Sequence, residues 1–419
     1  MTGAKNANGA KIVILTLCLG AVVGIVLWLF LRVVSLGSSL IWNVIPQKTG
    51  LSWIVVPLCA FGGCAAGLVR KKYGDYPEEL KVVMRKVKRE KHYDYSNMLV
   101  MLICALLPLV FGASVGPEAG LTGIIAALCY WVGDNVSFAK QNAALFSQLG
   151  EAITLGQIFH SPLFGILSVE EDPGEDGKPP ALPKLQKLAL YGLSAVAGFL
   201  VIAGLNRLFH TSMEGFPSFS HASIHAGDYA LIIPYILIGL LLCLIFEKAE
   251  KLLGAVSAHV PAVLRETLCG AVIGFVGMFA PLLLFSGEEQ MSHIMEFFGD
   301  YSPWVLIGVC FLKLILTAFC LRFGMKGGHF FPLIFACVCL GHGLAMLIFP
   351  AVADHAAFAA CVITSATLGA QLKKPLAVTL FMLLCFPLRL IIWIFTAAAV
   401  GARVMQLMEK KDSFPAESK

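Results

Sequence analysis

A single glutamate, Glu118, stands in a long apolar stretch of the sequence, between glycines and directly after a proline. The stretch covers residues 111–121 and reads FGASVGPEAGL. A carboxylate at the depth of a lipid bilayer is costly, so by default it indicates a functional site. Glycine and proline in such a stretch predict a broken helix whose amide groups line a cavity, because bare backbone cannot face lipid. The alternative is a carboxylate in a short aqueous loop between two spans.

A second glycine-rich break covers residues 324–332, reads GMKGGHFFP and precedes another apolar run. The N-terminus of a helix presents amide N–H groups and a partial positive charge, so it favours a bound anion. Two such helix ends meeting in the middle of the membrane would form an anion site without a fully buried lysine. The alternative is glycine used for close packing of helices, which is common in membranes.

Other chemical motifs are absent or lie in the wrong context. Ser114 completes the pattern G-x-S-x-G of hydrolases, but that motif requires the strand, turn and helix of an α/β sheet. A membrane serine hydrolase that uses Ser114 is therefore a remote alternative. The sequence contains neither HExxH nor GxxxxGK[ST], so we expect no enzyme, metal or cofactor. For His160, His329 and His342, packing or pore lining is a better explanation than metal binding.

The composition places these motifs in a membrane protein. Of the 419 residues 58% are hydrophobic and only 14% are charged, against roughly 25% charged in soluble proteins. The net charge of +5 gives no reason to expect a nucleic-acid partner, and the 13 cysteines lack the spacing of disulfides or metal sites. The basic run between residues 70 and 91 predicts a cytoplasmic loop. The apolar run from Ile12 is too long for a signal peptide and predicts a first membrane helix after a cytoplasmic N-terminus.

Apolar stretches of about 20 residues predict helices that cross the membrane. The candidate spans are 12–45, 50–69, 97–115, 184–209, 228–247, 262–284, 303–323, 333–350, 355–371 and 376–408. Four further apolar pieces are too short or too rich in glycine for a simple crossing, namely 120–133, 142–158, 161–169 and 286–298. Unequal and partial helices are typical of transporters and channels. We therefore predict an all-α, multi-pass integral membrane protein of the cell membrane.

An internal repeat underlies this pattern. The pattern Phe-Gly followed by a glycine occurs at residues 111–116 and again at 323–328, an offset of 212 (323 − 111). The pattern Leu-Gly followed by Pro-Leu occurs at residues 155–163 and again at 368–376, an offset of 213 (368 − 155). Repeated halves with interrupted helices predict a binding site near the middle of the membrane. We predict a single membrane domain with a first repeat at about 12–172, a linker at 173–183, a second half at 184–408 and a polar tail at 409–419.

These motifs resemble the CLC family of chloride channels and anion/proton antiporters. Residues 116–120 look like the family's segment G-[KR]-E-G-P, and residues 327–332 look like its segment G-G-x-F-x-P. Residues 155–171 are similar to a family helix that ends in paired glutamates, and Lys313 and Thr317 stand where the family has a basic residue and a threonine. The resemblance covers nearly the whole chain. It implies an inverted repeat of two halves and a homodimer with a separate ion pathway in each subunit.

The resemblance also implies roles for individual residues. Glu118 falls on the gating glutamate, which competes with the anion when deprotonated and carries protons in the exchangers. Glu170 or Glu171 falls on the inner acid of proton-coupled members, Glu171 being the closer match, although either could be a solvated residue of the acidic linker. The other implied residues line the anion pathway. They are Gly116, Ala119, Gly328, His329, Phe330, Phe331, Gly74, Asp75 and Tyr76.

Three departures from the family concern this pathway. Gly74 replaces a serine whose hydroxyl touches the anion, and the adjacent Asp75 would repel an anion unless it points away or is protonated. Pro117 replaces a basic residue and has no N–H to donate, and residues 401–419 contain no tyrosine to serve as a second side-chain ligand. The resemblance implies exchange of chloride or another halide for protons. The alternatives are a passive chloride channel gated by voltage or pH and a fluoride/proton antiporter.

Overall fold

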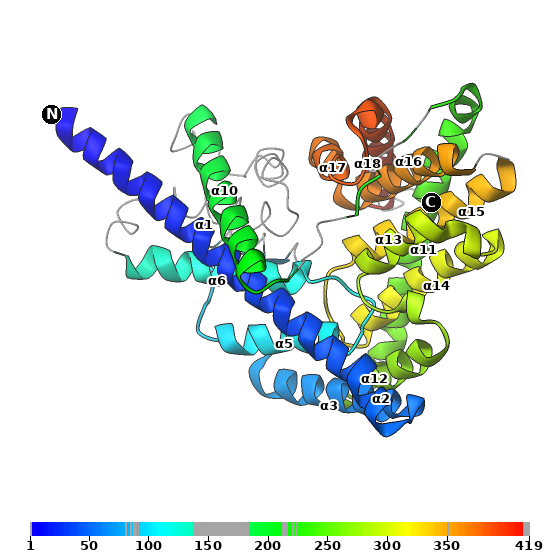
Figure 1. The fold of residues 1–419 in the computed structure, drawn as a ribbon, viewed down its shortest axis with the longest axis horizontal. Helices are drawn as coiled ribbons and strands as arrows, with labels where there is room; N and C mark the ends of the chain where they lie inside the picture. The colour runs from blue at the N-terminus through cyan, green and yellow to red at the C-terminus, as the bar shows by residue number, and fades with distance from the viewer. Residues whose placement is uncertain are drawn as a thin grey trace, which may run out of the picture. The chain divides into compact units, whose positions relative to one another are not determined.

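The structure is built almost entirely of helices (Figure 1). The computed structural model describes residues 2–79, 82, 83, 86, 90, 92–136, 184–211, 217–219, 222, 224–349 and 352–413. No β-strand forms in these residues, so the predicted all-α fold is confirmed. In chain order the elements are α1 (Thr2–Ser39), η1 (Leu40–Val44), α2 (Ile45–Thr49), η2 (Ser52–Ile54), α3 (Val55–Tyr73), α5 (Met98–Val110), α6 (Glu118–Asn135), α10 (Lys184–Leu208), α11 (Ala226–Ser257), α12 (Ala262–Phe279), η3 (Pro281–Leu283), α13 (Glu288–Phe297), η4 (Phe298–Asp300), α14 (Pro303–Arg322), α15 (Phe330–Ile348), α16 (Val352–Leu372), α17 (Pro375–Met382), η5 (Leu388–Leu390) and α18 (Ile391–Ser413).

The chain divides into two compact units. The first consists of Met1–Leu51, Leu68–Phe111 and Pro117–Gly215, and the second of Ser52–Gly67, Gly112–Gly116 and Phe216–Lys419. The boundaries of the sequence repeats and of the linker stay a prediction, because residues 137–183 lie outside the described part of the chain.

Nine helices of the described chain are long and apolar enough to cross a membrane, which makes the chain a multi-pass membrane protein. They agree with the predicted spans except at two places. The span expected at 97–115 is the shorter helix α5, because the chain turns at Gly112 with a φ of +78°. The span expected at 376–408 is divided into α17 and α18, because Pro387 has no N–H and disfavours a helical conformation in the residue before it.

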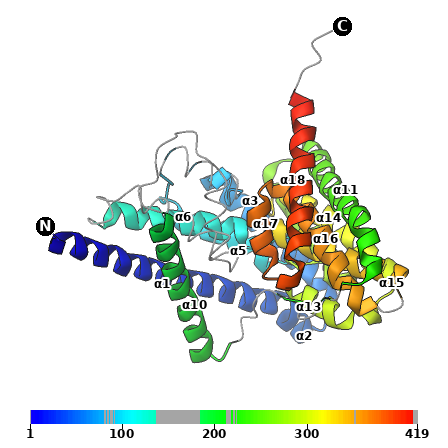
Figure 2. The same cartoon turned by 90° about the horizontal axis from the view of Figure 1, so that it is seen from above.

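Small residues bring the helices of each unit close together. In the first unit α1 and α10 lie side by side in both ribbon views (Figures 1 and 2). A Cβ atom on Gly20 of α1 would lie 2.2 Å from the carbonyl oxygen of Ser194 in α10. In the second unit a Cβ atom on Gly270 of α12 would lie 2.0 Å from the carbonyl oxygen of Cys59 in α3. Glycine therefore permits the backbone contacts that hold membrane helices together.

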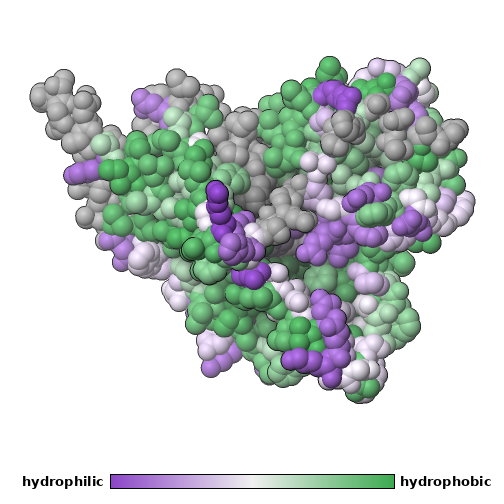
Figure 3. Space-filling view, in the orientation of Figure 1, coloured by the Kyte–Doolittle hydropathy of each residue, from purple (hydrophilic) through white to green (hydrophobic). Residues whose placement is uncertain are grey.

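Large apolar side chains remain on the outer surfaces of the helices. Phe61, Leu200, Ile233 and Trp304 are each exposed over roughly two thirds of their surface. Figure 3 shows hydrophobic residues over much of the visible face, with hydrophilic residues in smaller clusters. Lipid tails can cover such a surface, whereas soluble monomers rarely present apolar patches this extensive.

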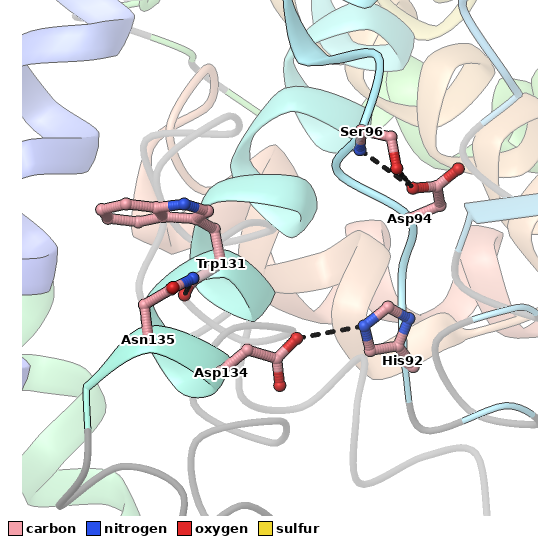
Figure 4. A network of polar contacts seen from close by, with 6 residues as sticks. All are labelled: His92, Asp94, Ser96, Trp131, Asp134 and Asn135. Atoms are coloured by element: carbon pink, nitrogen blue, oxygen red, sulfur yellow. Dashed lines mark hydrogen bonds and ion pairs between the residues drawn. The ribbon is translucent and has the colours of Figure 1, made fainter.

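A polar network fixes the C-terminal end of α6 in the first unit. The side chains of His92 and Asp134 point toward each other, and their nearest nitrogen and oxygen are 3.1 Å apart (Figure 4). Asp94 accepts hydrogen bonds from the hydroxyl and the N–H of Ser96, and these bonds lower the pKa of the Asp94 carboxyl. The segment that leads into α5 is thereby attached to the end of α6 that is farthest from Glu118.

Candidate functional site

The two glycine-rich breaks share their backbone features at a constant offset. Gly112 follows α5 with a φ of +78°, and Gly324 follows α14 with a φ of +96° (324 − 112 = 212). The next helices, α6 and α15, begin at Glu118 and Phe330 (330 − 118 = 212). The positive φ explains the glycines, since other residues rarely adopt this conformation. The offset predicted from the sequence therefore recurs in the local structure of both breaks.

Within the second unit the two breaks are joined by their backbones. The N–H of Gly116 donates to the carbonyl of Gly328 at 2.8 Å, and the N–H of Gly328 donates to the carbonyl of Gly116 at 2.7 Å. A Cβ atom on Gly327 would lie 2.5 Å from Cγ2 of Val115, so no side chain fits there. Two predicted site residues, Gly116 and Gly328, are thus in direct contact.

Buried hydroxyl groups hold the first break against α14. The hydroxyl of Thr317 donates to the carbonyl of Lys313 at 2.8 Å, so at 2.9 Å it accepts a hydrogen bond from Ser114. All three side chains are fully buried. A buried hydroxyl costs free energy unless it is hydrogen-bonded, so this pair fixes the position of the break.

The ammonium group of Lys313 is bound by three backbone oxygens. It donates to the carbonyls of Leu283 at 3.1 Å, Leu284 at 2.9 Å and Phe285 at 2.7 Å. The N–H of Phe285 in turn donates to the carbonyl of Gly112 at 3.2 Å. Since these bonds use all three donors of an ammonium group, Lys313 acts on the first break through its positive charge and through this loop.

Helix α15 begins directly after the second break. His329 precedes its first residue, and the N–H of Leu333 closes the first turn by donating to the carbonyl of His329 at 3.1 Å. The side chains of Phe330 and Phe331 are buried. The amide groups of a first helical turn have no partner within the helix and carry a partial positive charge. The N-terminal end of α15 therefore carries a partial positive charge that favours a nearby anion. The assignment of residues 329–331 to the anion pathway stays a prediction.

Glu118 is the first residue of α6 and belongs to the first unit. Its side chain is fully buried, and its carbonyl accepts a hydrogen bond from the hydroxyl of Thr122 at 2.6 Å. Two residues further along, a Cβ atom on Gly120 would lie 2.4 Å from the Cβ of Ala105, so α5 packs tightly against the first turn of α6. Gly116 precedes Glu118 by two residues, and covalent geometry limits the distance between their Cα atoms to about 7 Å.

Gly74, Asp75 and Tyr76 follow the end of α3 and belong to the first unit. The buried Ala119, at the start of α6, belongs to the same unit. Gly74 has a φ of +110°, a conformation that favours glycine. The side chain of Asp75 is exposed, so its charge is solvated. Arg70 fixes the turn by donating from Nε to the carbonyl of Tyr76.

A buried tyrosine connects the segment after this turn to α6. The hydroxyl of Tyr93 donates to the carboxylate of Glu78 at 3.2 Å, and Lys86 forms an ion pair with the same carboxylate. A Cβ atom on Gly123 of α6 would lie 3.3 Å from this hydroxyl. Burial is the main cause that raises the pKa of Tyr93, and the charge of Glu78 is the second. The hydroxyl therefore stays protonated and can donate this hydrogen bond. No motif or spacing in the sequence predicts this contact.

Three further acidic residues concern the site. The predicted pair Glu170 and Glu171 lies outside the described residues and stays a prediction. Glu266, a buried glutamate in α12, is a further candidate that was not among the residues predicted from the sequence. A Cβ atom on Gly324 would lie 2.4 Å from Cγ of Glu266, so this side chain packs directly against the second break. Its signal was an ionisable residue inside an apolar span, the same signal that identified Glu118.

The local structure around Ser114 differs from a hydrolase site. Ser114 lies after helix α5, and the described part of the chain contains no strand that could form a nucleophile elbow. The hydroxyl of Ser114 is bonded to Thr317, whereas a catalytic serine requires a nearby base such as histidine.

Comparison with known proteins gives matches over most of the chain. The family model described as voltage gated chloride channel matches residues 62–406. A candidate ion-transport protein named YfeO, from Escherichia coli O17:K52:H18 (strain UMN026), is 24% identical over 343 residues, which are 77% of this chain and 76% of the relative. The YfeO protein of Escherichia fergusonii has the same identity and coverage.

Solved structures with a similar fold include three membrane transport proteins. A slow cyanobacterial Cl⁻/H⁺ antiporter has a TM-score of 0.78 at 16% identity, with 96% of this chain and 98% of the other chain covered. A CLC-type fluoride/proton antiporter has a TM-score of 0.72 at 16% identity, with 95% and 96% covered. A eukaryotic CLC transporter has a TM-score of 0.72 at 13% identity, with 95% and 72% covered. At such identities the likeness shows the fold.

Proposed function

Because the chain belongs to the voltage-gated chloride channel family, we propose that it moves a small inorganic anion across the cell membrane in exchange for protons. Nine helices of the described chain are long and apolar enough to cross a membrane, which supports a transport role. In this proposal the anion binds at the breaks and Glu118 couples its movement to that of protons.

The observation that carries the proposal is the fully buried carboxylate of Glu118 at the first position of α6. A deprotonated carboxylate there carries the same charge as the transported anion and competes with it for the amide groups of a helix N-terminus. Protonation removes this charge, so the side chain can leave and the anion can enter. One group thereby links the movement of an anion to that of a proton.

The anion itself is proposed to bind at the start of α15. The paired backbones of Gly116 and Gly328 hold this break in a fixed shape. Lys313 adds a positive charge, since its ammonium group lies 5.3 Å from the centroid of the Phe335 ring in α15. In this proposal the positive end of the α15 dipole, at His329 and Phe330, attracts the anion. The ligands are backbone groups, so no side chain of the second break needs to carry a charge.

Chloride or another halide is the proposed ion, and fluoride is the second candidate. Gly74 offers no hydroxyl, and Pro117 offers neither a charge nor an N–H. These absences weaken the two contacts that the resemblance assigns to chloride. One protein of similar structure is described as a fluoride/proton antiporter and another as a Cl⁻/H⁺ antiporter, so both ions belong in the test.

The proton is proposed to continue through Glu171, or alternatively Glu170, on the cytoplasmic side. We further propose that two chains associate as a homodimer with one pathway each, as the family resemblance implies. Chemical crosslinking of the purified protein should then give a single product of twice the chain mass; a chain that stays monomeric at every concentration would contradict the dimer.

The experiment that tests the proposal is a flux measurement in liposomes that contain the purified protein. A gradient of chloride, fluoride, bromide or nitrate should drive anion movement and, through it, protons in the opposite direction. Anion movement without proton movement would support the alternative of a passive channel. No flux of any of the four anions at any pH would refute the transport proposal.

A further inference from the structure

A cluster of two histidines and one aspartate lies in the second unit, outside the candidate anion site. His225 precedes α11, Asp228 lies in the first turn of α11, and His355 lies in the first turn of α16. Nδ1 of His355 is 2.7 Å from Oδ1 of Asp228, and Nδ1 of His225 is 3.9 Å from Oδ2 of the same carboxylate. One potential ligand atom from each residue lies within 4.8 Å of the other two.

The local structure holds this carboxylate and one of the rings in place. The backbone N–H of His225 donates to Oδ2 of Asp228 at 2.8 Å, and the side chain of Asp228 is completely buried. The ring of Phe349 stacks on that of His355 at 3.6 Å between centroids and 7° between planes. The side chain of His225 is 47% exposed, so the cluster is open to solvent on one side.

These distances suit a tetrahedral metal ion. Zn²⁺ binds nitrogen and carboxylate oxygen at about 2.0–2.2 Å, which separates neighbouring ligand atoms by about 3.3–3.6 Å. The observed distances of 2.7 and 3.9 Å lie on either side of this value. Two imidazoles with one carboxylate are typical ligands of zinc and similar transition metals, whereas Ca²⁺ and Mg²⁺ prefer oxygen.

A buried hydroxyl nearby provides a second, independent observation. Tyr235 lies two turns along α11 from Asp228, on the same face, and helix side chains lean toward the N-terminus. Its hydroxyl is buried and has no hydrogen-bond partner in the part of the chain that the structure describes. Water on a metal ion with three protein ligands and a fourth, open position would supply such a partner.

The direction of the helices shows to which side of the membrane the cluster belongs. α11 and α16 run in parallel, since Asp228 meets His355 near their N-terminal ends and Gln371 donates to Cys243 at 3.5 Å further along. Basic residues gather at the opposite, C-terminal ends of α11, α14, α16 and α18, whereas Arg389 lies near the start of α18. The basic residues are Lys248, Lys251, Arg322, Lys373 and Lys410. Positive-inside bias places those C-terminal ends in the cytoplasm.

We propose that His225, Asp228 and His355 form a binding site for a divalent transition-metal ion of the zinc class, open to the non-cytoplasmic side of the membrane. In the metal-free protein the Nδ1–H of His355 donates to Asp228. Binding of the metal at this nitrogen requires the proton to move to Nε2 of the same ring, because a ligating nitrogen must be unprotonated. No spacing in the sequence predicted the site, since Asp228 and His355 are 127 residues apart.

Titration of the purified, tag-free full chain with Co²⁺ tests the site, because tetrahedral cobalt absorbs visible light and Zn²⁺ should displace it. One ion should bind per chain. His225→Ala should weaken binding by at least 10–100-fold, the loss seen when even a supporting group of a metal site is removed. This variant keeps the bond between Asp228 and His355 and the backbone donor of residue 225, so the local fold should survive.

Two further variants make the result decisive. His259→Ala removes an exposed histidine beyond the other end of α11 and should bind cobalt as the wild type does. Asp228→Asn keeps an acceptor for the backbone N–H of residue 225 but lowers the negative charge, and it should also weaken binding. If the wild-type protein shows no saturable binding of Co²⁺, the proposal is wrong, and the cluster serves only to join the starts of α11 and α16. Unchanged affinity in both His225→Ala and Asp228→Asn would also overturn the proposal.

Discussion

Replacement of Lys313 by methionine tests how the first break is held. The substitution keeps much of the volume of the side chain but removes the donor that binds the carbonyls of Leu283, Leu284 and Phe285. A hydrogen bond from a charged donor contributes about 1.5–3 kcal/mol in soluble proteins, and side-chain bonds in membrane helices average roughly 0.6 kcal/mol. Three lost bonds, partly offset by the relief of a buried charge, should lower stability by about 2–4 kcal/mol.

The assay is thermal unfolding of the detergent-purified protein, followed by tryptophan fluorescence. Lys313→Met should lower the midpoint by roughly 2–5 °C, since an unfolding entropy of about 2.1 cal/mol/K per residue gives about 1 °C per kcal/mol in a chain of 419 residues. Lys248→Met, which removes an exposed lysine from α11, should leave the midpoint unchanged. Anion uptake by Lys313→Met should also fall, because the positive charge beside the break is gone. An unchanged midpoint would refute the structural role assigned to Lys313.

Three further substitutions have distinct expected outcomes. Gly270→Ala forces a Cβ atom to within 2.0 Å of the Cys59 carbonyl and should destabilise the protein by about 1–3 kcal/mol, measured as a lower midpoint. Ser114→Ala removes the 2.9 Å bond to Thr317, so it should cost about 0.5–1.5 kcal/mol while anion flux persists; loss of a hydrolytic activity instead would favour the hydrolase alternative. Burial raises the pKa of Glu288 to about 7, so the folded protein keeps a proton that the unfolded chain loses near pH 4.5. The free energy of unfolding should therefore fall by up to about 3 kcal/mol as the pH rises from 4.5 to 7. Glu288→Gln should remove this dependence, measured from midpoints at pH 5 and pH 8.

Matched controls accompany two of these tests. Gly204→Ala places a Cβ atom in open space in α10, and because alanine is the better helix former it should not lower the midpoint. A comparable fall of the unfolding midpoint in Gly204→Ala and Gly270→Ala would contradict the packing argument for Gly270. Glu289→Gln replaces the exposed neighbour of Glu288 and should leave most of the pH dependence in place. If it removes all of that dependence, repulsion between the two carboxylates rather than burial is the cause.

The arrangement of spans and breaks could be predicted because it rests on local properties. Apolar length identifies most of the membrane helices, and glycine marks the two turns at Gly112 and Gly324, where φ is positive. Length alone failed at 97–115 and 376–408, because an apolar run does not reveal a turn inside it. Gly112 ends the first of these helices early, and Pro387 divides the second.

Contacts between distant residues could not be predicted in the same way. Ser114 and Thr317 are 203 residues apart, and the carbonyls that bind Lys313 are contributed by a loop about 30 residues before it. Hydropathy and periodicity describe which face of a helix is apolar, but they do not identify its partner. Glu266 is different, because a glutamate inside an apolar span is visible in the sequence, and only its contact with Gly324 required the structure.

The most direct test of the proposed mechanism is proton movement by Glu118→Gln in liposomes under an anion gradient. Glutamine has nearly the same shape as glutamate but cannot be charged or carry a proton, so anion flux should persist or rise while coupled proton movement disappears. Glu289→Gln, which alters an exposed carboxylate, should keep both fluxes. Proton movement in Glu118→Gln that equals that of the wild type would contradict the central role of this buried carboxylate.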